Sequence, residues 1–176
     1  MNADDSPISW MRRRQAQRAA AHLEAVRHRG LSRLERLGPD WHFVDVPAAD
    51  GRVAELIAIG PGGVHAVHVA DHGRDRVLLS QDIVHIKGRH LPYVTEARTG
   101  AQRIGRVLSD AAGVPVPVVP VLVLVGSGVI TVHGLPKKCL VTTDRELDRL
   151  LITGGTRVKP DTVDKLIVLA RHLFRG

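Results

Sequence analysis

The chain is best interpreted from residues 60 to 70, which read Gly60-Pro61-Gly62-Gly63-Val64-His65-Ala66-Val67-His68-Val69-Ala70. The glycines and proline at the start of this segment are typical of a tight turn. A run of β-favouring residues lies on each side of the turn, at Val53 to Ile59 and at Val64 to Val69. The segment therefore predicts a β-hairpin.

Hydrophobic periodicity predicts further elements on both sides of the hairpin. Helices are expected at residues 12–37, 96–112, 143–151 and from Asp161 onward. Strands are expected at residues 41–46, 76–79, 83–87, 118–125, 129–133 and 140–142. The order indicates an α/β fold in which helices flank a central mixed sheet.

Local signals predict three details of the connections. Asp50-Gly51 is typical of a hairpin turn ahead of the central hairpin. Gly126-Ser127-Gly128 predicts a turn that joins residues 118–125 and 129–133 in a hairpin. Thr143 and Glu146 have the spacing of a capping box, so we expect their side chains to cap the helix that follows.

The Gly-Pro-x-Gly-Val turn between two strands resembles the nuclease-related (NERD) domain, a family of the restriction-endonuclease-like superfamily. The resemblance extends from about Gly30 to the C-terminus, and residues 32–41 and 96–126 also fit the family pattern. It implies an αβββαβ core. In this interpretation residues 1–38 form a basic N-terminal helical segment, and residues 39–176 form the nuclease-related α/β domain.

The resemblance also implies a degenerate active site on the hairpin. The family's first catalytic Asp falls on Glu55, its second acid on His68 and its Lys on Ala70. Such nucleases hold Mg²⁺ between two carboxylates, while an ammonium group stabilises charge in the transition state. Imidazole suits Mg²⁺ poorly, and a methyl group carries no charge. The replacement of Asp/Glu-x-Lys by His68-Val69-Ala70 therefore predicts that magnesium-dependent cleavage is lost.

An altered metal site is the alternative for the same residues. His68, Asp71 and His72 follow one another at the strand end, and Glu55 is expected beside them. Such a set of nitrogen and oxygen ligands would suit Zn²⁺ or Mn²⁺. Polar residues at strand ends are more often solvated loops, so our expectation is that the protein holds no metal or cofactor.

Charge is concentrated near the N-terminus. The net charge is +7, and 20 of the 25 basic residues are Arg. Residues 1–37 contain eight Arg against four acids. Arginine suits phosphate recognition, although Arg-rich, Lys-poor usage is also what a GC-rich bacterial genome produces.

A helix over residues 12–37 would separate two kinds of side chain. One side would hold Ala16, Ala19, Ala20, Leu23, Val26, Leu34 and Leu37, and we expect that side to dock on the core. The opposite side, together with a basic loop expected at residues 87–90, provides the candidate nucleic-acid contacts Arg14, Arg18, Arg29, Arg33, Arg36, Lys87 and Arg89.

The remaining composition excludes several classes of protein. The single cysteine, Cys139, cannot form an internal disulfide, and it suits a small buried hydrophobe in a cytoplasmic protein. No run of residues is apolar enough to cross a membrane. Gly60-x-Gly62 and Gly126-x-Gly128 lack the further residues of a nucleotide-binding loop.

Three functions remain open from the sequence. The first is non-specific nucleic-acid binding by a domain that has lost catalysis. The second is a protein–protein interaction scaffold, with Trp10 and Met11 as exposed anchors beside arginine. The third is a divergent metal-dependent nuclease that relies on Glu55.

Overall fold

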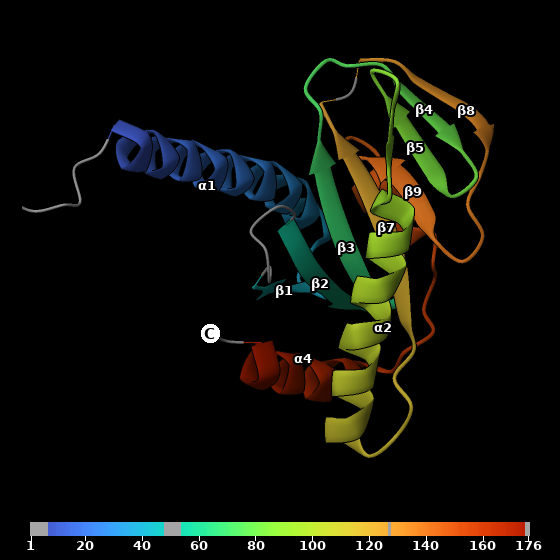
Figure 1. Cartoon of the computed structure of the whole chain (residues 1–176). Coiled ribbons are helices and arrows are strands. Elements are labelled where there is room, and N and C mark those ends of the chain that lie inside the picture. The colour runs from blue at the N-terminus through green and yellow to red at the C-terminus, as the bar shows by residue number, and fades with distance from the viewer. Residues whose placement is uncertain (1–6, 48–53, 127, 175–176) are drawn as a thin grey trace, which may run out of the picture.

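The computed structural model describes residues 7–47, 54–126 and 128–174. Within these ranges it describes the side chains of all residues except 7–9, 19–20, 22–23, 26–27, 29–31, 33 and 54. The expected Asp50-Gly51 turn lies outside the described residues. The α/β class is confirmed, because a mixed sheet carries helices on both faces (Figure 1).

The main sheet has five strands in the order β1-β2-β3-β7-β9. Their bounds are β1 His42–Val46, β2 Ala54–Gly60, β3 Gly63–Asp71, β7 Val118–Val125 and β9 Leu140–Thr143. The first three strands pair antiparallel, whereas β7 and β9 run parallel to β3. The predicted central hairpin is thus β2–β3, and it lies in the middle of the sheet.

Each face of the main sheet has its own hydrophobic core. Helices α2 (Tyr93–Ala112) and α4 (Pro160–Phe174) cover one face, where Ile104 and Ile167 pack against Ile57. On the other face, Leu34 at the end of α1 (Pro7–Leu34) and Leu151 of α3 (Leu147–Ile152) join the second core. Because both faces are covered, β3 is buried along most of its length.

A smaller second sheet has the order β6-β5-β4-β8. Its strands are β4 Val77–Ser80, β5 Ile83–Ile86, β6 Arg89–Leu91 and β8 Ile130–Gly134. The expected loop at residues 87–90 is therefore a turn at Lys87-Gly88 followed by a third strand. This sheet packs against the start of α2 and one side of β7, where Leu79 and Leu122 share a third core.

The predicted hairpin between residues 118–125 and 129–133 is wrong. Strand β8 belongs to the second sheet, where it pairs parallel with β4 and not with β7. Just before β8 begins, the Val129 carbonyl accepts a hydrogen bond from the N–H of Val77, the first residue of β4. At the adjacent Gly128, a Cβ would lie 2.7 Å from the Arg74 carbonyl, so glycine permits this close approach.

The turn of the central hairpin is held by packing on both sides. A Cβ at Gly60 would overlap the buried ring of Trp41. The Pro61 carbonyl accepts hydrogen bonds from the N–H groups of Arg157 and Val158. Gly63 has a φ of +114°, a conformation that favours glycine. The glycine-rich sequence is therefore explained by the structure of the turn itself.

The predicted capping box is also wrong. Helix α3 has Glu146 at its N-cap position, and no side chain caps it. The Glu146 carboxylate instead accepts a hydrogen bond from Arg149, three residues further along the chain. The predicted helix from Asp161 onward is confirmed as α4, which buries Val163, Leu166, Ile167 and Ala170.

Helix α1 extends away from the rest of the molecule (Figure 1). It contacts β2, β3, α3 and the short 3-10 helix η1 (Glu35–Leu37). Residues 10–18 are all exposed, including Ala16 on the side that was expected to dock. The docking prediction is therefore wrong for Ala16, but it is confirmed for Leu34, which is buried, and for Leu37, which packs against the same core. Ala19, Ala20, Leu23 and Val26 lie outside the described side chains.

No described helix combines the length and the apolar character that crossing a membrane requires.

Candidate functional site

Glu55 and His68 lie directly opposite each other in the central hairpin. They are Cα partners in the antiparallel register of β2 and β3. Because side chains alternate along a strand, Glu55 lies on the same face as Ile57 and Ile59, under helix α2. The hairpin thus brings together the two residues that the sequence resemblance selected.

Helix α2 adds two charged side chains to this pair. The His68 ring lies between two carboxylates, with Nδ1 3.7 Å from Glu55 Oε1 and Nε2 3.6 Å from Glu96 Oε2. Arg103 Nη2 donates to Glu55 Oε2 at 2.6 Å. We call Glu55, His68, Glu96 and Arg103 the hairpin site.

A glycine on α2 makes room for the hairpin site. Gly100 lies between Glu96 and Arg103 at a spacing that places all three on one face of the helix. A Cβ at Gly100 would overlap the carboxylate of Glu55. Glycine at this position therefore allows Glu55 to lie directly against the helix backbone.

The surroundings of Glu55 favour its ionised form. The neighbouring His68 side chain lowers the pKa of the carboxyl most, partial burial opposes that effect, and Arg103 lowers the pKa further. The net result is a lowered pKa. Both distances from the His68 ring nitrogens to these carboxylates are longer than a normal hydrogen bond.

Two features of the hairpin bear on the expectation that magnesium-dependent cleavage is lost. Ala70 is buried in the third core beside Leu122 and Leu124, so no ammonium stands at the position of the family's lysine. The Glu55 carboxylate is already occupied by Arg103. The carboxylate of Glu55 is thus paired with a guanidinium group, whereas the resemblance implies a carboxylate that binds Mg²⁺.

The altered metal site of His68, Asp71, His72 and Glu55 is not formed. Among the described residues, no group of three or more His, Cys, Asp or Glu side chains is arranged to hold a metal ion. His72 instead bonds through Nε2 to the hydroxyl of Tyr93, at 2.5 Å. Burial lowers the pKa of His72, which favours the neutral ring.

Three residues of this region were not predicted from the sequence to lie at the site: Tyr93, Glu96 and Arg103. Their contacts depend on how α2 packs across the sheet, which no local pattern reveals. One signal was present, because Glu96, Gly100 and Arg103 follow one another at spacings of four and three residues on a single helix face.

A second histidine of β3 faces the opposite side of the sheet. His65 is 5% exposed, and its ring lies 5.8 Å from that of Trp41. Burial, with a contribution from Arg157, lowers the pKa of His65 to about 4. His65 is therefore neutral at physiological pH, and its surroundings are those of a core residue.

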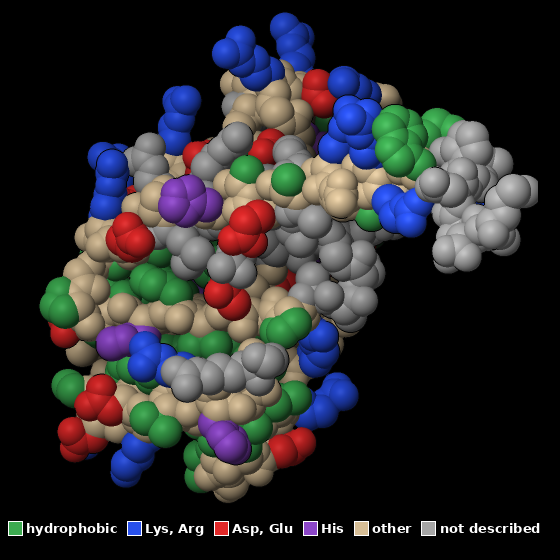
Figure 2. Space-filling model, turned by 90° about the vertical axis from the view of Figure 1, so that its left-hand side faces the viewer, with side chains coloured by type: hydrophobic (Ala, Val, Ile, Leu, Met, Phe, Trp, Pro, Cys, Tyr) green, Lys and Arg blue, Asp and Glu red, His purple; other side chains and the backbone are tan. Residues whose placement is uncertain are grey.

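The arginines of α1 form a separate, exposed surface. We call residues 10–18 the basic arm. Arg12, Arg14 and Arg18 are exposed, and no ion pair within the described part of the chain involves them. Figure 2 views the molecule from the side on which α1 projects, and Lys and Arg side chains stand out from its upper part.

The arm also carries exposed apolar side chains. Trp10 and Met11 are 50% and 55% exposed. The Arg14 guanidinium lies 4.5 Å from the centre of the Trp10 ring, which is a cation–π contact. The tip of the arm thus combines positive charge with an exposed aromatic surface.

The other candidate contacts differ in how available they are. Arg36 and Arg89 are exposed, whereas Arg29 and Arg33 lie outside the described side chains. Lys87 forms an ion pair with Asp75 at 3.1 Å. Only part of the predicted basic surface is therefore free to meet phosphate.

Comparison with protein-family models, with curated proteins and with solved structures finds no match to this chain.

Proposed function

We propose that this protein binds nucleic acid without sequence preference, through its basic arm, and that its hairpin site no longer cleaves phosphodiesters. The observation that carries the proposal is the exposure of Arg12, Arg14 and Arg18 on a helix that projects from the fold. Guanidinium groups pair well with phosphate oxygens.

The arm has the physical features that non-specific binding requires. Arg14 and Arg18 are one helical turn apart, so they lie on the same side of the arm. Each arginine that meets a phosphate releases a bound counterion, and this release drives sequence-independent binding. Trp10 supplies an aromatic face on which an unpaired base can stack.

The chain order supports a restriction-endonuclease-like scaffold for this activity. Elements α1, β1, β2, β3, α2 and β7 follow one another as the resemblance implies, with β4 to β6 inserted before α2. Glu55 and His68 face each other at the positions that the family uses for catalysis. The contact of Glu55 with Arg103 and that of His68 with Glu96 support the loss of cleavage.

Fluorescence anisotropy tests the proposal. Wild-type protein should bind duplex DNA, single-stranded DNA or RNA at about 50 mM salt, with affinity that falls steeply as salt is added. The variant R12Q/R14Q/R18Q should bind at least about 100-fold more weakly. The control R106Q/R145Q/R171Q removes the same charge from exposed sites elsewhere and should retain most of the affinity.

Two results would contradict the proposal. The first is no binding by wild-type protein to any of the three nucleic acids. The second is equal weakening by the arm variant and by its charge-matched control, because net charge alone would then explain the binding. Plasmid nicking with Mg²⁺ that stops in Glu55→Ala would show that the divergent-nuclease alternative is correct.

Exposure of Trp10 and Met11 favours a second candidate, a protein partner that docks on the tip of the arm. Aromatic and Met side chains beside arginine are enriched at protein interfaces. In a pull-down treated with nuclease, a protein partner would stay bound to wild type and be lost from Trp10→Ala. Loss of every partner on nuclease treatment would exclude this candidate.

A further inference from the structure

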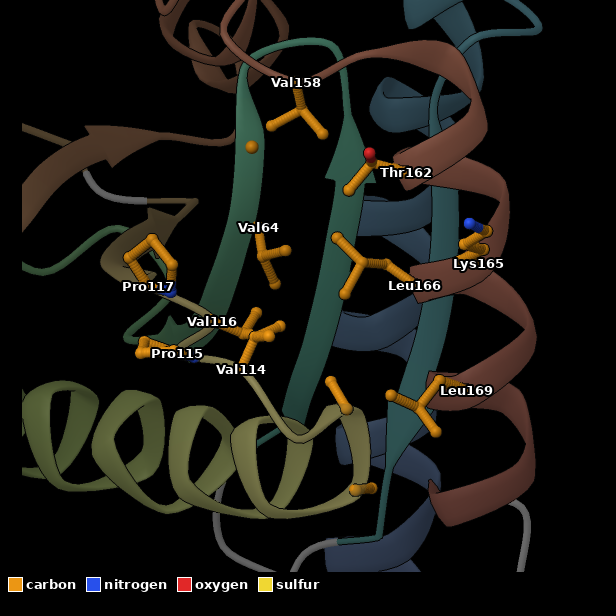
Figure 3. A pocket seen from close by; sticks show the side chains of 13 residues that line it. Val64, Val114, Pro115, Val116, Pro117, Val158, Thr162, Lys165, Leu166 and Leu169 are labelled. Atoms are coloured by element: carbon orange, nitrogen blue, oxygen red, sulfur yellow. The ribbon is translucent and has the colours of Figure 1, made fainter.

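A hydrophobic hollow lies at the turn end of the central hairpin, away from the hairpin site. It has a volume of about 450 Å³ and lies between the end of α2, helix α4 and the start of β3 (Figure 3). Ligand pockets in proteins have volumes of roughly 300 to 1,000 Å³. The hollow is therefore large enough for a small molecule.

The walls of the hollow are aliphatic. Val64 of β3 and Leu166 and Leu169 of α4 line it, and Val114 and Val116 complete the wall that leads from α2 to β7. Val114 remains 59% exposed. An apolar chain placed here would cover aliphatic surface that water now contacts.

Two further residues make the wall stiff. Pro115 and Pro117 alternate with the valines along one side (Figure 3). Each proline has its φ angle fixed by its ring. Little ordering of the wall is then needed when a ligand binds, which favours affinity.

The polar side chains among the residues that line the hollow come from helix α4. Thr162 and Lys165 both line the hollow and are three residues apart on α4, so they lie on one face of that helix. No ion pair in the described ranges 7–47, 54–126 and 128–174 involves Lys165. An aliphatic hollow with one ammonium and one hydroxyl group is complementary to an anion that has an apolar tail.

We propose that this hollow binds a medium-chain aliphatic carboxylate, with its chain against the valines and leucines and its carboxylate beside Lys165. At roughly 30 Å³ per non-hydrogen atom, the volume suits a ligand of about 15 such atoms. Dodecanoate, a saturated carboxylate of this size, is the probe of choice. The site is independent of the nucleic-acid surface on the arm.

Isothermal titration calorimetry with dodecanoate, below its micelle concentration, tests the proposal on the whole chain. Binding of one molecule is expected, with Kd on the order of 10⁻⁵ to 10⁻⁴ M for a ligand this small. Lys165→Gln should weaken dodecanoate about tenfold and leave dodecanol binding unchanged. Lys138→Gln, which removes an exposed lysine elsewhere, should bind dodecanoate as wild type does.

A second variant tests the contribution of the hollow to binding independently of the charge of Lys165. Ala112→Trp places a large ring in the hollow and should abolish binding of both dodecanoate and dodecanol. Ala112 is exposed at the end of α2, so the variant should fold, which circular dichroism can verify.

Three results would overturn the proposal. These are no binding of dodecanoate to wild type at about 1 mM, full binding by Ala112→Trp, or equal affinity of wild type and Lys165→Gln for dodecanoate. Self-association of wild type that Ala112→Trp abolishes, without dodecanoate binding, would assign the hollow to a second copy of the chain instead.

Discussion

The basic arm and the hairpin site both contain arginine, but in opposite surroundings. Arg14 and Arg18 of the arm are exposed and have no acidic partner among the described residues. Arg103 of the hairpin site is bound to Glu55, which also lies beside the buried His68. Of these two regions, the arm offers uncompensated charge to a partner, while Arg103 and Glu55 of the hairpin site are paired with each other within the fold.

This contrast predicts a separation of effects. Substitutions in the packed body should change the free energy of unfolding and leave nucleic-acid affinity unchanged. Substitutions in the arm should do the reverse.

Gly60→Ala should cause the largest loss, about 3 kcal/mol of the free energy of unfolding, because its Cβ would overlap the buried Trp41 ring. Gly105→Ala in α2 is the control, since its Cβ would meet only ordinary contacts from 3.4 Å. Urea unfolding measures both. A Gly60→Ala variant as stable as Gly105→Ala would show that the turn is not held by Trp41.

His65 should make the protein sensitive to mild acid. Its pKa is lowered to about 4 in the folded state from a usual value near 6.5, so between these values the unfolded chain binds a proton that the folded chain does not. Folding is thus weakened as pH falls, by about 2 kcal/mol from pH 7.5 to pH 5.

His65→Leu tests this assignment, because it keeps an apolar contact with Trp41 and cannot be protonated. Most of the stability loss between about pH 7.5 and about pH 5 should disappear. His72, whose pKa is also lowered, accounts for a smaller remaining loss. An unchanged pH profile in urea unfolding would mean that another group is responsible.

Glu55→Gln should cost about 1 kcal/mol at neutral pH, because Arg103 loses a charged hydrogen-bond partner and His68 a neighbouring carboxylate. The pKa of Glu55 is lowered on folding, so the difference should shrink as pH falls below its usual value of 4.5. Glu146→Gln removes an exposed pair with Arg149 and should have almost no effect. Weaker nucleic-acid binding by Glu55→Gln would place the hairpin site in the interface.

The arm variant R12Q/R14Q/R18Q should change stability least, by less than about 0.5 kcal/mol, since these exposed side chains have no acidic partner among the described residues and contribute little to folding. A thermal melt beside wild type checks this. A large loss would mean that the arm packs on the body in solution, and reduced affinity could then not be assigned to its charge.

Local patterns in the sequence were enough to find most strands and helices. The sequences of β2, β3 and β7 are strongly aliphatic. Residues 60–63 are rich in glycine, as the tight turn between β2 and β3 requires. The partner of β8 could not be predicted, because it depends on a contact between Val77 and Val129 that are far apart in the chain. Docking of α1 was inferred from periodicity alone, and Ala16 shows that an alanine-rich face need not be buried.

Two of the four residues of the hairpin site could also be predicted from the sequence. Glu55 and His68 follow from counting outward from the turn, because antiparallel register places them opposite each other. Glu96 and Arg103 depend on the position of α2 across the sheet, and no spacing in the sequence encodes that position. The consequence is that the sequence suggested a damaged metal site, whereas in the structure Glu55 is paired with Arg103 and the His68 ring lies between two carboxylates.

The salt dependence of nucleic-acid binding tests the central claim most directly. For wild type and R12Q/R14Q/R18Q on a duplex of roughly 20 base pairs, the logarithm of the affinity should fall linearly with the logarithm of salt concentration. The slope for the variant should be smaller in magnitude by about 3, one unit for each phosphate contact removed. Parallel lines for the two proteins would contradict the claim that these arginines contact phosphate.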